Sequence, residues 1–182
     1  MKAFFQNYLD FFITFCSGFV VLSQYYLENI EGLTPCNLCL IQSYTARIVF
    51  VIFLIKALTP ILKTYFDILG ILALTIGLSA GSRQIYLQNL PKDQLPDGLC
   101  DMPFDVIFNI YPFFEGIQKI FIGSSKCAEE VWTFLSLNIP EWSTVYFASM
   151  ILLILLRYLL IFINMTKSVS YTHLTLPTIG EV

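Results

Sequence analysis

The chain has 182 residues, of which 57% are hydrophobic and only 13% are charged. A soluble domain of this size carries roughly a quarter charged residues, so this composition and the mean hydropathy of +0.73 favour an integral membrane protein. The net charge of −3 is too small to indicate nucleic-acid binding.

Four segments are apolar over about the length that a helix needs to cross a bilayer, which is roughly 20 residues. These predicted spans cover residues 11–27, 38–58, 66–86 and 144–165. The third span is rich in small residues, which permit close helix packing in lipid. We therefore predict an all-α integral membrane protein whose single domain, residues 1–167, is a four-transmembrane-helix bundle.

The distribution of lysine predicts the orientation of this bundle. Lysines flank the outer ends of the spans and the turn between the second and third: Lys2, Lys56, Lys63 and Lys167. The loop 28–35 contains neither lysine nor arginine. By the positive-inside rule, both termini are cytoplasmic, and the loops 28–35 and 87–142 lie on the outer face.

Cys36 and Cys39 form a C-x-x-C pair at the start of the second span. Thr34 suits a helix N-cap and Pro35 the first helical position, so both thiols are expected in the first helical turn. The positive end of the helix dipole favours a thiolate there, and a thiolate is the nucleophile of thiol–disulfide exchange. The pattern favours a redox pair over a static disulfide or two buried thiols.

The long outer loop holds two further cysteines, Cys100 and Cys127. Their spacing alone favours a structural disulfide, with a second redox pair as the alternative. A zinc site is disfavoured because this pair lacks C-x-x-C spacing, so no metal is predicted. Residues 104–122 have near-helical apolar spacing, interrupted at Pro112, which is typical of a short interfacial helix or of a segment packed on the bundle.

Three further predictions concern a cysteine inside the first span, two arginines near span ends and the C-terminal segment. Cys16 lies inside the first span and is expected to behave as a small apolar residue. Arg83 and Arg157 lie near span ends, where their side chains are expected to extend to the interface. Residues 168–182 break abruptly in composition and predict a disordered tail, and the same break would mark a segment that is not native to the protein.

The cysteine motifs together resemble those of the disulfide bond formation protein B (DsbB) family, including its DsbI branch. The resemblance covers about Phe11 to Tyr158 and rests on four motifs in the same order. These motifs are Pro35-Cys36-Asn37-Leu38-Cys39, then Cys100-Asp101, then Cys127-Ala128-Glu129 followed by Trp132, and finally Pro140-Glu141-Trp142.

The resemblance implies a thiol oxidase of the bacterial inner membrane, a protein-disulfide:quinone oxidoreductase. Its partner would be a periplasmic thioredoxin-like oxidant of the DsbA or DsbL type, and its electron acceptor ubiquinone or menaquinone. It also implies that Cys100 forms the mixed disulfide with the partner and that Cys127 resolves it. Cys36 and Cys39 would re-oxidise them through a transient Cys36–Cys127 bridge, with Cys39 facing the quinone.

One position departs from the family pattern. Members commonly carry an arginine, linked with quinone binding, four residues after the second cysteine of the C-x-x-C, and Ser43 stands there in this chain. Arg47, one helical turn deeper, is the candidate replacement, and the alternative is that it pairs with a neighbouring polar group or extends to the interface. Cys39, Ser43 and Arg47 are therefore the predicted quinone-binding residues.

Two other functions remain open from the residues alone. One is an enzyme like vitamin K epoxide reductase, which uses similar chemistry on a similar bundle, although this chain has a single C-x-x-C and a different loop layout. The other is a non-enzymatic membrane scaffold whose disulfides are structural.

Overall fold

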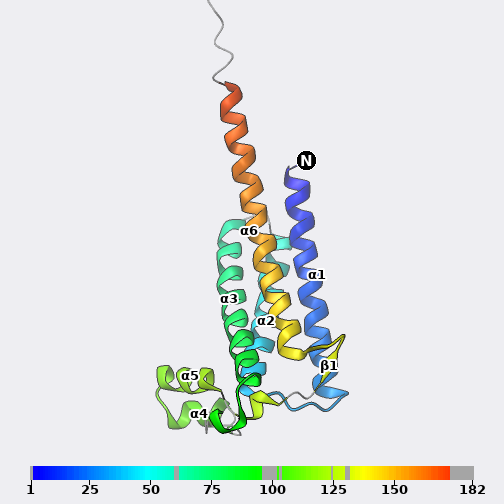
Figure 1. Cartoon of the computed structure of the whole chain (residues 1–182). Helices are drawn as coiled ribbons and strands as arrows, with labels where there is room; N and C mark the ends of the chain where they lie inside the picture. The colour runs from blue at the N-terminus through cyan, green and yellow to red at the C-terminus, as the bar shows by residue number, and fades with distance from the viewer. Residues whose placement is uncertain are drawn as a thin grey trace, which may run out of the picture.

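The structure is a computed structural model that describes residues 2–59, 62–95, 102, 104–123, 125–129 and 132–172. Its body consists of four long helices: α1 (Lys2–Asn29), α2 (Asn37–Leu58), α3 (Lys63–Gln88) and α6 (Ile139–Thr172). Each contains a stretch long and apolar enough to cross a membrane. The predicted four-helix membrane bundle is confirmed (Figure 1).

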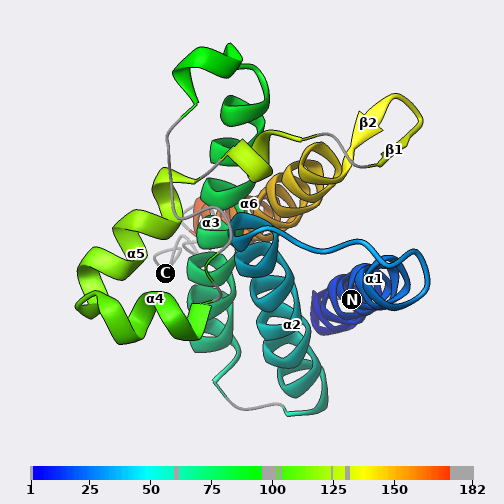
Figure 2. The ribbon, with the colours of Figure 1, turned by 90° about the horizontal axis from the view of Figure 1, so that it is seen from below.

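The two ends of the bundle differ. The N-terminus and the last turns of α6 lie at one end, which we call the far end, and the short loop elements gather at the other (Figure 1). We call this second end the thiol end, because α2 begins there with its C-x-x-C pair. Figure 2 looks onto the thiol end and shows α4 and α5 to one side of α3, with β1 and β2 on the other side beside α6.

Helix α6 is longer than the span that the sequence predicts. It continues beyond Lys167 to Thr172, into the segment for which we predict a disordered tail. The remaining residues of that segment, 173–182, lie outside the described part of the chain.

The connection from α3 to α6 contains the predicted interfacial segment. It is helical, as expected, but divided into α4 (Phe104–Ile110) and α5 (Phe113–Ile122). Pro112 is the N-cap of α5, where its missing N–H leaves no hydrogen bond unmade. The same connection contains the 3-10 helices η1 (Lys92–Gln94) and η2 (Ser125–Ala128) and the two short strands β1 (Thr133–Phe134) and β2 (Leu137–Asn138).

Helix α3 packs closely between α2 and α6 through its small residues. A Cβ at Gly70 would lie 2.6 Å from the ring of Phe53 on α2. A Cβ at Gly77 would likewise overlap the ring of Phe147 on α6. Both phenylalanines are fully buried, so the glycines of α3 provide the space for the two largest rings of the core.

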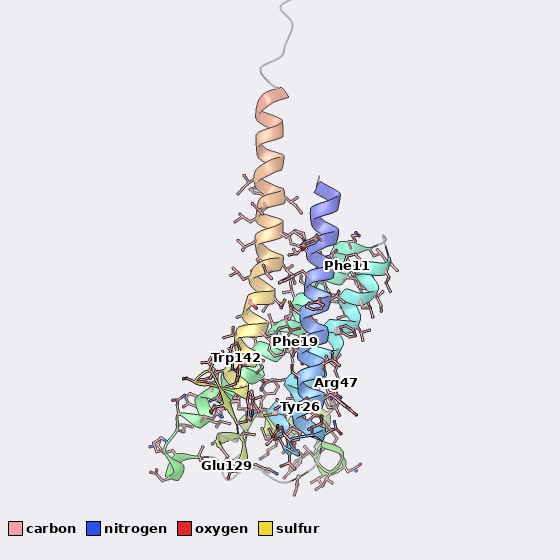
Figure 3. All side chains as sticks on the ribbon, turned by 90° about the vertical axis from the view of Figure 1, so that its right-hand side faces the viewer. Phe11, Phe19, Tyr26, Arg47, Glu129 and Trp142 are labelled. Atoms are coloured by element: carbon pink, nitrogen blue, oxygen red, sulfur yellow. The ribbon has the colours of Figure 1, made fainter. Side chains whose placement is uncertain are left out.

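The outer surface of the bundle is apolar, as a lipid-facing surface is. On α1 the side chains of Phe15 and Phe19 are 74% and 65% exposed, whereas Ile13 between the helices is fully buried. Figure 3 shows Phe11, Phe19 and Tyr26 spaced along α1. Cys16 packs against the hydrophobic core, in line with the expectation of a small apolar role.

The far half of the bundle contains a buried cluster of four charged side chains, one from each long helix. Lys56 donates to Asp10 at 2.7 Å and to Asp67, and Arg157 donates to Asp10 at 2.8 Å and to Asp67. The expectation that Arg157 extends to the interface is wrong, because its side chain is only 6% exposed. The carboxylates of Asp10 and Asp67 give the Arg157 guanidinium two partners inside the bundle. Burying these charges as pairs is more favourable than burying any of them unpaired.

A short hairpin sets the start of α6. Leu135 and Ser136 form its turn with positive φ values of 52° and 65°, the conformation that suits a two-residue hairpin loop. The Asn138 carboxamide then accepts the N–H of Glu141 at 3.0 Å, and the Glu141 carboxylate accepts the N–H of Asn138 at 2.8 Å. This reciprocal capping box fixes the first turn of α6.

Candidate functional site

The C-x-x-C pair lies at the N-terminus of α2, but the helix begins later than the sequence predicts. Cys36, not Thr34, is the N-cap, with φ −76° and ψ 168°, and its carbonyl accepts the N–H of Leu40 at 2.9 Å. Contacts with the α3–α6 connection account for the difference, since the Asn37 carboxamide donates to the carbonyl of Met102 at 3.3 Å. The two sulfurs nevertheless meet, with Cys36 Sγ 3.4 Å from Cys39 Sγ.

Cys127 lies on η2 and is brought back to the bundle by two contacts. Gly123 ends α5 with φ 79°, and a Cβ there would overlap the side chain of Leu87 on α3. The Arg83 guanidinium donates to the carbonyls of Phe121 and Ile122 at 3.1 and 3.0 Å. Arg83 therefore caps the end of α5.

Three of the four predicted catalytic cysteines meet at one point. Cys36 lies between Cys39 and Cys127, hydrogen-bonded with both. Cys36 and Cys127 are only 7% and 1% exposed. Hydrogen bonding with Cys127 and Cys39, together with burial, raises the pKa of the Cys36 thiol well above its ordinary value. Cys36 is thus the sulfur common to both possible exchanges.

The fourth predicted catalytic cysteine, Cys100, lies outside the described residues, as does Asp101. Its pairing with Cys127 stays a prediction. The nearest described residue after it in the sequence is Met102, whose carbonyl accepts the hydrogen bond from Asn37 beside the C-x-x-C.

Two of the three predicted quinone-binding residues, Ser43 and Arg47, contact α1, whereas Cys39 contacts Gln84 of α3. The Ser43 Oγ lies 3.3 Å from Gln24 Oε1 and 3.5 Å from Glu28 Oε1, and its single proton is shared between these two acceptors. Arg47 Nη2 lies 3.5 Å from Glu28 Oε2, and its side chain is 44% exposed. Figure 3 shows Arg47 projecting from the side of the bundle next to α1. Arg47 therefore lies within ion-pair distance of Glu28, and its role in quinone binding stays a prediction.

A cavity of about 240 Å³ opens beside the thiols, between the ends of all four long helices. Its wall includes Cys36 and Cys39 from the redox pair and Ser43 and Glu28 from the α1–α2 side. Arg47 is not among the described residues that line the cavity. The other lining residues are Gln24, Leu27, Leu33, Thr34, Pro35, Gln42, Gln84, Gln88, Lys126, Glu129, Trp132, Asn138, Ile139, Pro140 and Ser143.

Sequence reasoning missed the polar groups that contact the redox pair from the other helices. Gln84 Nε2 on α3 donates to Cys39 Sγ at 3.1 Å, and Gln42 Nε2 donates to Gln84 Oε1 at 2.8 Å. The Ser143 hydroxyl of α6 donates to the Gln42 carbonyl oxygen. The sequence offered one signal for Gln42 and Gln84, which is that both lie inside predicted apolar spans. A polar side chain there is costly unless it has a partner.

Comparison with known proteins gives the family. The sequence matches the family described as "Disulfide bond formation protein DsbB" over residues 6–157. It is 35% identical to disulfide bond formation protein B of Marinobacter nauticus over 141 residues, which covers 76% of this chain and 82% of the relative. It is 32% identical to the protein of the same name from Hahella chejuensis over 155 residues, covering 81% of this chain and 90% of the relative.

A third relative is disulfide bond formation protein B 1 of Pseudomonas aeruginosa, 35% identical over 132 residues that cover 68% of this chain and 77% of the relative. These matches favour the thiol oxidase over the reductase-like enzyme and the scaffold. The chain belongs to the DsbB family and is a multi-pass membrane oxidoreductase that re-oxidises DsbA and transfers the electrons to quinone.

Proposed function

We propose that the thiol end faces the periplasm of a bacterial inner membrane and that a soluble partner of the DsbA or DsbL type is oxidised there. The charge distribution supports this orientation, since Lys63 lies at the opposite end of the bundle, where α3 begins. The observation that carries the proposal is the contact of Cys36 with both Cys39 and Cys127, because it connects the loop cysteines to the C-x-x-C.

The first exchange uses the disulfide that we propose between Cys100 and Cys127. A thiolate of the reduced partner attacks Cys100, which forms the mixed disulfide and releases Cys127 as a thiolate. The second thiol of the partner then displaces Cys100, so the partner leaves oxidised and the loop pair is reduced. Cys127 is only 1% exposed, which supports Cys100 as the sulfur that meets a soluble protein.

The second exchange passes the electrons inward. The Cys127 thiolate attacks Cys36 of an oxidised Cys36–Cys39 pair, which forms the Cys36–Cys127 bond and breaks the Cys36–Cys39 bond. The electron pair of the broken bond goes to Cys39. Cys100 then attacks Cys127, which restores the loop disulfide and leaves Cys36 and Cys39 reduced. The adjacent positions of the three sulfurs allow this without a large movement of α2.

The cavity beside Cys39 has the residues that a quinone head group requires. Ser43 and Gln24 provide polar contacts for ring oxygens, and Leu27 and Pro140 provide apolar surface for the ring faces. Bound quinone would supply a two-electron, two-proton acceptor for the Cys36–Cys39 dithiol. We propose that Cys39 and Ser43 contact it directly and that Arg47 acts through Glu28, which it neutralises.

Purified protein in detergent, a reduced DsbA-type partner and a soluble quinone test the proposal. Quinone reduction should cease in Cys39→Ser, Cys100→Ser and Cys127→Ser. In Cys39→Ser, which has no Cys36–Cys39 disulfide, the Cys36 thiolate should instead attack Cys127 of the loop disulfide and release Cys100 as a thiolate. A Cys36–Cys127 disulfide should therefore accumulate, identified by peptide mass mapping without reduction. Cys16→Ser is the matched control and should keep full turnover, because Cys16 packs in the core away from the thiol end.

Either of two results would overturn the relay. One is full turnover in Cys127→Ser, which would mean that the partner exchanges with the C-x-x-C directly. The other is a Cys39→Ser protein in which Cys36 forms its trapped bond with a cysteine other than Cys127. Turnover with the protein reconstituted in the opposite orientation, with the thiol end away from the added partner, would overturn the proposed topology.

A further inference from the structure

Two glutamines are buried inside the bundle next to the redox pair. Gln42 on α2 and Gln84 on α3 are each only 3% exposed. A primary amide removed from water without hydrogen bonds costs several kcal/mol in an apolar environment, so such residues persist where their partners are fixed. Here they lie between α2, α3 and α6, and their contacts form a continuous chain that ends at Cys39.

A backbone carbonyl sets the direction of this chain. Gln42 contacts the carbonyl oxygen of Leu38 at 3.3 Å, and a carbonyl can only accept a hydrogen bond, so the contacting atom of Gln42 is the nitrogen. The same nitrogen lies 2.8 Å from Gln84, which must therefore present its oxygen to Gln42. The Ser143 hydroxyl contacts the oxygen end of Gln42 and also the carbonyl of Pro140 at 3.1 Å, so the direction of the chain rests on the Leu38 carbonyl.

The consequence is that the nitrogen of Gln84 faces Cys39. Gln84 Nε2 lies 3.1 Å from Cys39 Sγ and donates to it, and it is closer to the sulfur than Gln84 Oε1, which lies at 3.4 Å. Arg47, the cation that the sequence singled out for quinone binding, is paired with Glu28. The sulfur of Cys39 thus receives a hydrogen bond from a neutral amide whose orientation is fixed by two other helices.

We propose that Gln84 is a catalytic residue that stabilises the Cys39 thiolate, and that Gln42 and Ser143 are positioning residues that hold the Gln84 amide with its nitrogen toward the sulfur. The inference rests on the proposed function, in which the attack of Cys127 on Cys36 expels Cys39 with the electron pair of the broken bond. The charge moves from Cys127 to Cys39, and the hydrogen bond from Gln84 becomes charge-assisted at that moment.

Gln84→Met tests the donor, because methionine retains the length and volume of glutamine without an N–H. In the fully reduced protein, the pH midpoint of Cys39 alkylation should move upward by about one unit, the equivalent of roughly one hydrogen bond to a charged group. Quinone reduction with a reduced DsbA-type partner should slow by about tenfold. Gln42→Met should shift the midpoint in the same direction by less.

Ser143→Ala and Ser149→Ala are a matched pair on α6. Ser143 contacts Gln42, whereas Ser149 donates to the carbonyl of Tyr146 on its own helix, at 2.9 Å. The first should shift the midpoint and the second should not. If Gln84→Met does not fold, Ser143→Ala, which removes a single hydroxyl, gives the same test at smaller amplitude.

An unchanged alkylation midpoint in both Gln84→Met and Ser143→Ala would overturn the inference. A lower melting temperature in these variants would not rescue it, because a purely structural role predicts lower stability with an unchanged midpoint. Failure of the proposed function is distinguishable from this result. In that case the unmodified protein would not reduce quinone with any partner, while the alkylation profile would still report whether Gln84 contacts the thiolate.

Discussion

The four buried charges of the far half give the sharpest prediction about stability. Asp10, Lys56, Asp67 and Arg157 come from four different helices and sum to zero charge. All four side chains are between 0% and 6% exposed. Removing one charge leaves a net charge inside the bundle, so Arg157→Met should lower the free energy of unfolding by about 3–5 kcal/mol.

A second change should restore most of that loss. Asp67→Leu combined with Arg157→Met removes one charge of each sign and leaves the Lys56–Asp10 pair at 2.7 Å. In the described part of the chain, Asp10 Oδ2 and Arg157 Nε have no hydrogen-bond partner, so burial of the full cluster is not completely offset. The double variant should therefore lose about 2 kcal/mol or less, well below the sum of the two single variants.

Unfolding of the purified variants in detergent micelles, followed by helical circular dichroism, measures these differences. The double-mutant cycle should give a coupling free energy of about 4 kcal/mol or more between positions 67 and 157, since two losses of about 3–5 kcal/mol would combine to about 2 kcal/mol or less. A coupling below about 0.5 kcal/mol would refute the reasoning, since it would mean that the two side chains contribute independently and that water or lipid head groups solvate them.

Three further predictions concern the thiol end. Gly123→Ala should slow quinone turnover and lower the melting temperature, because φ at this residue is 79° and an added Cβ would overlap the side chain of Leu87. Gly32→Ala is the control, because Gly32 has a similar φ of 67° but open surroundings. It should cost only the backbone strain of about 1–2 kcal/mol. Cys127→Ala should lower the pKa of the Cys36 thiol, because the lost hydrogen bond favours its protonated form, and Cys36 should then be alkylated at lower pH; an unchanged pH profile would contradict this. Arg47→Ala should lower stability by less than about 1 kcal/mol, since its ion pair spans 3.5 Å and its side chain is 44% exposed. It should also slow quinone reduction less than the buried-amide variants do, and the reverse order would make Arg47 the quinone ligand.

The spans could be predicted from the sequence because lipid imposes a simple requirement. Each crossing segment must satisfy its own backbone hydrogen bonds and must be apolar over about 20 residues, and both properties are local. The small residues of α3 were readable for the same reason, since Gly70 and Gly77 recur along one segment and pack against rings of the neighbouring helices.

The partners of the polar residues could not be predicted, because they depend on which helices become neighbours. Arg157 meets Asp10 across a sequence separation of 147 residues, and no local pattern specifies that pair. The prediction of where α2 begins was wrong for a related reason. Thr34 and Pro35 are good local start residues, but contacts of Asn37 and Cys36 with the distant α3–α6 connection move the first helical residue to Asn37.

The absence of an arginine at position 43 has a structural consequence for the redox centre. A cation can stabilise a thiolate over a range of orientations, because its field acts in all directions. An amide does so only when its N–H is aimed at the sulfur, since hydrogen bonds weaken steeply away from linear geometry. With Ser43 turned toward Gln24 and Glu28, the Cys39 sulfur depends on the orientation of Gln84.

That orientation depends in turn on how α2, α3 and α6 are held together. The amide chain joins these three helices at the thiol end, and the buried charges join the same three, with α1, in the far half. A charge that fixes the axial position of each helix therefore also fixes the distance between Gln84 and Cys39. We infer that the buried ion pairs, whose net contribution to stability is small, specify one arrangement of the helices and so hold Gln84 beside Cys39.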